Sequence, residues 1–347
     1  MSIAISGCGG SSSSSAGSTS DGGSTSGGGE EGGEAPKLAL SNSYVESSWR
    51  PQMIHDFETE AEKLEGEGRI SGFEVQNAEN SVATQRQQIQ TMVGQGAEVI
   101  VIDAASETGL NSVIEQAVAK GVTVVTFDNP ASASGSLNLF QDENIITNKS
   151  AEEIARLAGE KGTVVEMNGV AGSPLSDDRE KRADEVFAKY PEINVVKANA
   201  EWNAAVAKQK MATILAQNPE ITGVWDQGDM ASGVQSAFEE AGIEKLPPIV
   251  ADGTYGFLNT WAKLKKQEGY ETVGIVVPPA IVLDAVWAGL KLDEGGEAKE
   301  NPLTLSHPLI TNETLAEYVN AKEPAGNFID VPVVDEEALY NEYMTGP

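Results

Sequence analysis

Short aliphatic runs alternate along this chain with segments in which apolar residues recur at helical spacing. Residues 38–40 form the first run, and Met53, Phe57 and Leu64 then fall on one face of a helix. Residues 99–102 are continuously aliphatic and end at Asp103, which is typical of a parallel strand covered on both faces. The pattern therefore predicts successive strand–helix–strand units.

The same alternation continues to about residue 292. It predicts strands at residues 122–127, 163–167, 194–196, 223–225, 249–251 and 273–277, and helices at 110–118, 150–160, 176–189, 203–217, 230–240, 257–266 and 281–292. One sheet holding that many parallel strands would be unusually wide. We therefore expect an α/β protein with two doubly wound parallel-sheet lobes.

The N-terminal segment has a different composition. Residues 9–35 are almost entirely Gly, Ser and Thr with a few acids, which predicts a flexible linker because no large apolar side chain is available for a core. Residues 5–8, Ile-Ser-Gly-Cys, resemble the lipobox of bacterial lipoproteins, in which the cysteine carries a lipid. We expect Cys8 to be a lipid anchor and residues 1–36 to form a tether. A chance run of small residues is the alternative.

Charge and composition exclude several classes of protein. The chain carries 53 acidic against 23 basic residues, a net charge of −30, so phosphate backbones and anionic membrane surfaces should repel it. One cysteine allows no internal disulfide or multi-cysteine zinc site, and two histidines leave little for metal chemistry. We expect no cofactor, no metal and no nucleic acid.

Polar and aromatic residues follow the predicted strands, where ligands collect in sheets of this kind. Carboxylates accept hydrogen bonds from neighbouring hydroxyls, and tryptophan presents a flat apolar face to the C–H side of a sugar ring. A polyhydroxylated ligand would suit such a set. The candidate ligand-binding residues are Asn42, Ser43, Trp49, Arg50, Asp128, Asn129, Asp177, Arg179, Trp202, Gln227, Asp229 and Asp252.

Each candidate also has a simpler explanation. Asp128 and Asp252 could cap helices or turns, as aspartates at strand–helix junctions commonly do. Trp49 and Trp202 could be half-buried packing residues. Asp177 lies at a predicted helix start, where the helix dipole favours acids. Their joint occurrence at strand ends, rather than any single residue, favours a binding site.

Four segments, residues 122–128, 165–172, 223–227 and 251–254, resemble the type I periplasmic sugar-binding proteins, the ribose- and galactofuranose-binding group that serves ABC importers. The resemblance runs from Lys37 to about Thr311. It implies that Asp128 and Asp252 bind sugar hydroxyls and that Trp49 and Trp202 are the aromatic contacts.

Several positions depart from the ribose-binding pattern. Asn129 and Asp177 stand where that pattern has arginines, and Val277 is aliphatic where a polar residue is expected. An expected Asn near Gly228 is also missing. These departures count against ribose and leave open another pentose, a hexose, a polyol, or a ligand with one apolar edge.

The resemblance also implies a three-crossing hinge near residues 146, 277 and 306. We expect an N-terminal lobe of residues 37–146 plus 278–305 and a C-terminal lobe of residues 147–277 plus 306–347. The implied function is that of a monomeric extracytoplasmic receptor, which closes on a small neutral sugar or polyol and delivers it to an ABC permease. An acidic cleft would disfavour acidic sugars.

Other functions remain as alternatives. The same fold could bind a non-sugar molecule or feed a sensory receptor. An enzyme is disfavoured, since the sequence has no Gly-rich phosphate loop, no G-x-S-x-G elbow and no Cys/His pair, although Asp177 and Asp229 could in principle hydrolyse a glycoside. A sugar-responsive repressor would need a DNA-reading domain where the linker stands.

Overall fold

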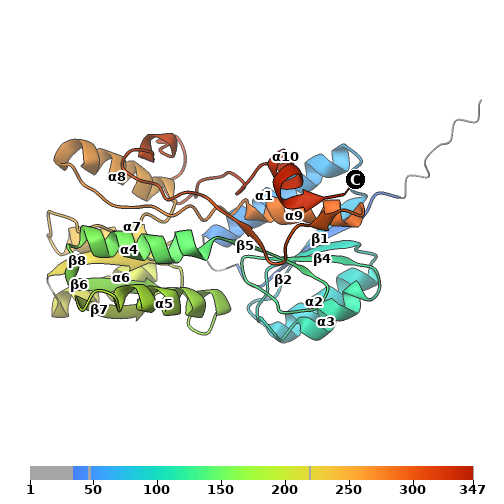
Figure 1. Ribbon diagram of the computed structural model, residues 1–347, viewed down its shortest axis with the longest axis horizontal. Helices are drawn as coiled ribbons and strands as arrows, with labels where there is room; N and C mark the ends of the chain where they lie inside the picture. Colours follow the sequence, from blue (N-terminus) through green and yellow to red (C-terminus); the bar gives the residue numbers. More distant parts are fainter. Residues whose placement is uncertain (1–33, 46–47, 219, 347) are drawn as a thin grey trace, which may run out of the picture. The chain divides into compact units, whose positions relative to one another are not determined.

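A computed structural model describes residues 34–45, 48–218 and 220–346. All but Glu34 belong to one compact unit, residues 35–347. Within this unit the chain builds two α/β lobes, each around its own parallel sheet (Figure 1). The lipobox-like run with Cys8 and nearly all of the predicted tether lie outside the described residues.

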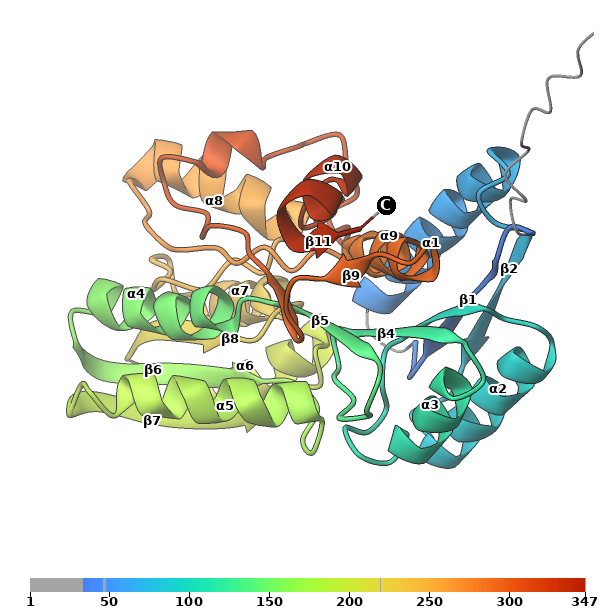
Figure 2. The ribbon, with the colours of Figure 1, turned by 45° about the vertical axis from the view of Figure 1, so that its right-hand side comes forward.

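The N-terminal lobe is built on a six-stranded sheet in the order β10-β5-β4-β3-β1-β2, with every pair parallel. Its helices lie on both faces, with α2 and α3 together on one face (Figure 2) and α1 and α9 on the other. The strands are β1 (Lys37–Asn42), β2 (Gly72–Asn77), β3 (Val99–Ile102), β4 (Thr123–Phe127), β5 (Leu137–Gln141) and β10 (Leu303–Leu305), and the helices are α1 (Trp49–Gly66), α2 (Val82–Gly94), α3 (Asn111–Val118) and α9 (Ile281–Asp293).

Alternation along the central strands explains why helices cover both faces. Leu38 and Val99 pack in one hydrophobic cluster with residues of α1 and α9. Ala39 and Ile100, one position further along the same strands, pack in another with residues of α2 and α3. Both side-chain sets are apolar because neither face meets water.

The C-terminal lobe is built on a three-stranded parallel sheet in the order β7-β6-β8. Cores on its two faces lie against α4 and α5 on one side and α6 and α7 on the other. The strands are β6 (Lys161–Asn168), β7 (Glu192–Asn199) and β8 (Ile221–Asp226), and the helices are α4 (Ser150–Leu157), α5 (Pro174–Phe187), α6 (Ala204–Gln217), α7 (Ala231–Glu240) and α8 (Tyr255–Glu268).

Two predicted strands of this lobe are present only as single bridges. Ile249 pairs with Val224, and Gly274 pairs with Ala251 and Ile310. Proline at 248, which lacks an N–H, and Gly253 with its positive φ of 78° bracket residues 249–251, so a regular ladder has no room to extend. These segments nevertheless continue the sheet beyond β8.

The chain passes between the lobes at four places. The π-helical segment Asn144–Lys149 leads into α4, residues 277–280 lead into α9, and residues after 305 lead back to the bridge at Ile310. Phe328 still pairs with Thr254 in the C-terminal lobe, whereas Val333 already contacts α9. The residues between them form a fourth crossing.

The expectation that residues 306–347 all pack on the C-terminal lobe is therefore wrong for residues 333–345. The buried carboxylate of Asp284 on α9 accepts hydrogen bonds from the N–H groups of Val333 (2.9 Å) and Val334 (3.1 Å). After α10 (Glu336–Ala338) and the π-helical turn Leu339–Tyr343, β11 (Met344–Thr345) pairs with β9 (Glu297–Ala298). Hydrogen bonds to the Asp284 carboxylate and apolar packing around Leu339 hold residues 333–345 against α9.

Among the described residues, no helix combines the length and apolarity that a membrane span requires.

Candidate functional site

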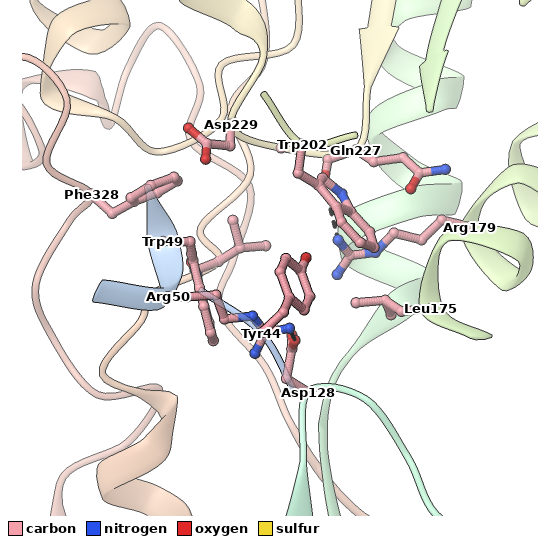
Figure 3. Close-up of a pocket in the computed structure, with 12 residues that line it drawn as sticks. Tyr44, Trp49, Arg50, Asp128, Leu175, Arg179, Trp202, Gln227, Asp229 and Phe328 are labelled. Atoms are coloured by element: carbon pink, nitrogen blue, oxygen red, sulfur yellow. Dashed lines mark hydrogen bonds and ion pairs between the residues drawn. The ribbon is translucent and has the colours of Figure 1, made fainter. Parts of the chain in front are cut away.

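The carboxyl ends of the strands in the two lobes border one pocket. It contains about 440 Å³ of space free of protein atoms, a figure that includes its open mouth. Figure 3 shows Trp49 and Phe328 on one side and Leu175 and Arg179 on the opposite side. The lining residues are Tyr44, Trp49, Arg50, Asp128, Leu175, Arg179, Trp202, Gln227, Gly228, Asp229, Val277 and Phe328.

Arg50 is the centre of the N-terminal side of the pocket. Its guanidinium forms ion pairs with Asp103 and with Asp128 (Nη2 to Oδ2, 2.9 Å), and it lies 5.0 Å from the centre of the Tyr44 ring. Burial lowers the pKa of Arg50, but the attraction of Asp103 and Asp128 outweighs that effect and the pKa is raised. Arg50 therefore stays a cation and compensates two buried carboxylates.

Neighbouring polar groups complete this network. The Ser43 hydroxyl donates to Asp103 (2.7 Å), and the Asn129 amide donates to Asp103 (2.9 Å) and to Asp128 (3.2 Å). Burial raises the pKa of Asp128, while Arg50 lowers it in part. Oδ2 of Asp128 accepts the hydrogen bonds from Arg50 and Asn129, so neither of these two bonds uses Oδ1.

Arg179 on α5 is also paired within the protein. Its Nε and Nη2 donate to Glu143, the shortest contact being 2.7 Å, and its Nη1 donates to the main-chain oxygen of Gln227 at 3.0 Å. Its side chain is 5% exposed. Both arginines that line the pocket thus already pair with carboxylates. The positive charge of each is therefore compensated within the protein, without an anionic ligand.

Asp229 joins the C-terminal lobe to the start of α1. The hydroxyl of Ser48 donates to both of its carboxylate oxygens at 2.7 Å, and the Ser48 N–H donates to Oδ2 at 3.2 Å. A carboxylate at a helix N-terminus accepts free N–H groups and is favoured by the helix dipole. Burial raises the pKa of Asp229 to about 7, against the lowering effect of the Ser48 bonds.

Three pocket residues have a backbone with positive φ, a conformation that residues other than glycine rarely adopt. Asp128 has φ of 57°, Trp202 of 49° and Asp229 of 57°. Such conformations carry strain and persist where the surrounding structure imposes them, as at binding sites. A methyl group added to Gly169 would lie 2.2 Å from the Trp202 ring, so the missing side chain of Gly169 makes room for that ring.

Seven of the twelve sequence-predicted residues line this pocket: Trp49, Arg50, Asp128, Arg179, Trp202, Gln227 and Asp229. Gln227 turns its amide away from the pocket centre (Figure 3), donating to Asn168 and the main chain of Ser176 and accepting from Gly169 N–H. It therefore shapes the wall without offering its amide to a ligand.

The other five predicted residues do not line the pocket. Asn42 bonds to Asn77 and Tyr44, Asp177 accepts from Gly172 N–H, and Asp252 accepts from the N–H groups of Ala231 and Thr254 and from the Thr254 hydroxyl. These contacts agree with the simpler explanations, Asp252 as a turn or cap residue and Asp177 as an acid near a helix start, and a contact of either with a ligand stays a prediction.

Ser43 and Asn129 lie one step outward. They line an adjoining cleft, which contains about 590 Å³ of space free of protein atoms including its opening to solvent and shares Tyr44 and Trp202 with the main pocket. A contact of these two residues with a bound ligand stays a prediction.

Sequence reasoning missed Tyr44, Leu175, Gly228, Val277 and Phe328 as lining residues. Tyr44 directly follows two predicted residues at the end of β1, and Val277 had been noted only as a departure from a family pattern. Phe328 gave no signal, since its segment has no apolar periodicity. Within residues 34–45, 48–218 and 220–346, no group of three or more His, Cys, Asp or Glu side chains could hold a metal ion.

Comparison with known proteins defines the class. The model of the periplasmic binding protein domain matches residues 38–293, so the chain belongs to this family. The resemblance inferred from the sequence and the two-lobed α/β fold are both confirmed. The family and the named relatives are binding proteins rather than enzymes.

Individual relatives share part of the chain. The xylitol-binding protein of Mycolicibacterium smegmatis is 30% identical over 189 residues, covering 53% of this chain and 54% of that protein. The D-apiose import binding protein of Actinobacillus succinogenes is 28% identical over 208 residues, covering 57% and 66%. The chain thus spans about half to two thirds of the length of these curated relatives.

A solved structure covers more of the chain. The ABC transporter solute binding protein from Thermobispora bispora superimposes with a TM-score of 0.78 at 26% identity, covering 88% of this chain and 94% of that one. Most of both lobes is therefore shared with a known solute-binding protein.

Proposed function

We propose that this protein is an extracytoplasmic receptor of an ABC importer, which binds a small neutral sugar or polyol in the pocket between its lobes and delivers it to a permease. The observation that carries the proposal is the pairing of the pocket's arginines with carboxylates of the protein. Aspartates and aromatic side chains face the open space, while both arginines are already bound to carboxylates.

This arrangement suits a neutral hydroxylated ligand. Asp128 can accept a hydrogen bond from a hydroxyl, and such charge-assisted bonds are stronger than neutral ones. The rings of Trp49 and Trp202 offer apolar faces to the C–H side of a sugar or polyol. An acidic sugar would bring a further negative charge beside Asp128 and Asp229, at a cost in Coulomb energy. The relatives named for xylitol and D-apiose also support a polyol or sugar.

The lobe crossings support delivery by closure. The chain crosses between the lobes four times. A hinge of this kind lets two lobes close around a ligand and present a closed surface to a membrane partner. Family membership implies a location outside the cytoplasm. We further propose that Cys8 anchors the protein by a lipid and that it works as a monomer with ABC permease subunits as partners.

A thermal-shift screen over sugars, polyols and acidic sugars tests the ligand class. A ligand held only by the folded state raises the melting temperature by mass action, by about 2.7 kcal/mol of added stability at one hundred times Kd. We expect shifts with neutral sugars or polyols and none with their uronic acid counterparts. Shifts confined to nucleosides, aromatic acids or uronic acids would contradict the proposal.

A matched pair of variants locates the binding. Asp128→Ala should abolish the shift, whereas Asp177→Ala should leave it unchanged, because Asp177 bonds to Gly172 N–H outside the pocket. An equal loss in both variants would show that the effect does not arise from the pocket. Circular dichroism and the melting temperature without ligand establish that both variants are folded.

A further inference from the structure

One residue of the pocket wall, Phe328, comes from the part of the chain beyond the family match, which ends at residue 293. Phe328 lies there with 1% of its surface exposed, in the same hydrophobic cluster as Trp49 and Val277. All three residues line the pocket, and Figure 3 shows Phe328 beside Trp49. The segment that makes the fourth crossing therefore shapes the site.

The main chain of Phe328 is held from both lobes. On the α1 side, Gln52 accepts from the Phe328 N–H (3.0 Å) and donates to its carbonyl oxygen (3.3 Å). On the other side, Phe328 bridges to Thr254, and the Ile329 N–H donates to Gly253 at 2.9 Å. The ring is thus fixed in the wall by the fold, independently of a ligand.

The wall formed by Trp49, Val277 and Phe328 offers few hydrogen bonds. The indole N–H of Trp49 donates to the carbonyl oxygen of Val277 at 2.7 Å, which uses both groups within the wall. The side chains of Val277 and Phe328 have no polar atoms. Asp229, which lies near Phe328 in Figure 3, already accepts from Ser48 through both oxygens.

A ligand hydroxyl packed against this wall would lose its water and find no hydrogen-bond partner among the side chains of Trp49, Val277 and Phe328. A buried hydroxyl without a partner carries its full desolvation cost, and an apolar pocket rejects an analogue that adds one hydroxyl by up to about a hundredfold. Asp128, whose carboxylate can accept a hydrogen bond from a ligand, lies away from Phe328 in Figure 3. The two sides of the pocket therefore favour different edges of one ligand.

We propose that the ligand is a deoxy or methyl-bearing sugar or polyol whose apolar edge packs on Phe328, and that the apolar wall of Trp49, Val277 and Phe328 determines this specificity. The inference rests on the proposed function and refines its ligand class. It assigns the hydroxyls of the ligand to the Asp128 side and a carbon without hydroxyl to the wall of Trp49, Val277 and Phe328.

Titration calorimetry with pairs of sugars that differ by one hydroxyl tests the inference. Suitable pairs are D-fucose with D-galactose, L-rhamnose with L-mannose, and 2-deoxy-D-ribose with D-ribose. The wild-type protein should bind the deoxy member of at least one pair about tenfold or more tightly than its hydroxylated partner. Hydroxylated members that bind as well or better in every pair would overturn the inference.

Variants then assign the preference to the wall. Val277→Thr replaces a methyl group by a hydroxyl with little change in volume, and Phe328→Tyr adds a hydroxyl to the ring. Either should reduce the preference for the deoxy member by about tenfold, because the wall gains a hydrogen-bonding group. Phe328→Leu keeps the wall apolar and should retain the preference. An unchanged preference in folded Val277→Thr and Phe328→Tyr would overturn the assignment.

The outcomes separate this inference from the function on which it rests. Binding of sugars or polyols without preference for a deoxy member contradicts the inference and leaves the proposed function standing. Absence of binding to every sugar and polyol contradicts both.

Discussion

The aspartates at the strand ends of the two lobes occupy similar positions in sequence but have different roles. In the N-terminal lobe, Asp103 and Asp128 surround a buried arginine, and Asp128 faces the pocket. In the C-terminal lobe, the Asp252 carboxylate accepts hydrogen bonds from main-chain N–H groups and from the Thr254 hydroxyl. Position at a strand end therefore does not by itself decide whether a carboxylate faces the pocket.

The largest expected effect, on the stability of the protein, comes from removing the Arg50 cation. Arg50→Met should destabilise the protein by about 3–5 kcal/mol, because Asp103 and Asp128 would remain buried without a counterion. Urea unfolding followed by circular dichroism measures the change. Arg156→Met is the control, since its side chain is 60% exposed and pairs only at the surface, so its effect should stay within about 0.5 kcal/mol. Equal effects for the two variants would remove Arg50 from the centre of the comparison.

The next effect contrasts one aspartate from each lobe. Asp128→Asn should weaken binding of the ligand found by screening by about tenfold to a hundredfold, because a charge-assisted hydrogen bond to the ligand is lost. Asp252→Asn should cost about 1–2 kcal/mol in stability, through its bonds to Ala231 and Thr254, and change affinity by less than about threefold. Calorimetric titration and urea unfolding measure both quantities. The reverse pattern would show that Asp252 is the ligand-facing carboxylate.

The smallest effect concerns Asp229 and pH. Its pKa is about 7 in the folded protein against a usual 3.8, so the native state binds the proton more tightly than the unfolded chain does. Stability should therefore fall as pH rises from about 4 to about 7 and level off above. Asp229→Asn should reduce this fall by on the order of 1 kcal/mol, measured as urea midpoints at pH 5 and pH 8. The same fall in wild type and variant would contradict the raised pKa.

Much of the fold could be predicted from apolar periodicity. The continuous runs that became β3 and β4 are aliphatic because both faces are covered. The polar segments were missed: α2 buries only Gln85, Ile89 and Met92, and β2 is half-buried along most of its length, so neither shows a clear apolar stripe. The return of residues 333–345 to α9 depends on a single buried carboxylate, Asp284, that periodicity does not reveal.

The sequence predicts which residues lie at strand ends, but it does not predict which of their side chains point into the pocket. The strand-end rule found Asp128, Trp202 and Asp229, but it could not tell them from Asp252, whose acceptors are taken by a local turn. Phe328 reaches the pocket through pairing with Gln52 and Thr254, contacts between residues far apart in the chain. Such contacts leave no local pattern in the sequence.

The crystal structure of the complex with the tightest ligand from the screen tests the central claim most directly. We expect the ligand between Trp49 and Trp202, with a hydroxyl within hydrogen-bonding distance of the Asp128 carboxylate and no ligand contact to Asp252. A ligand hydrogen-bonded to Asp252, or bound outside the residues that line this pocket, would contradict the account.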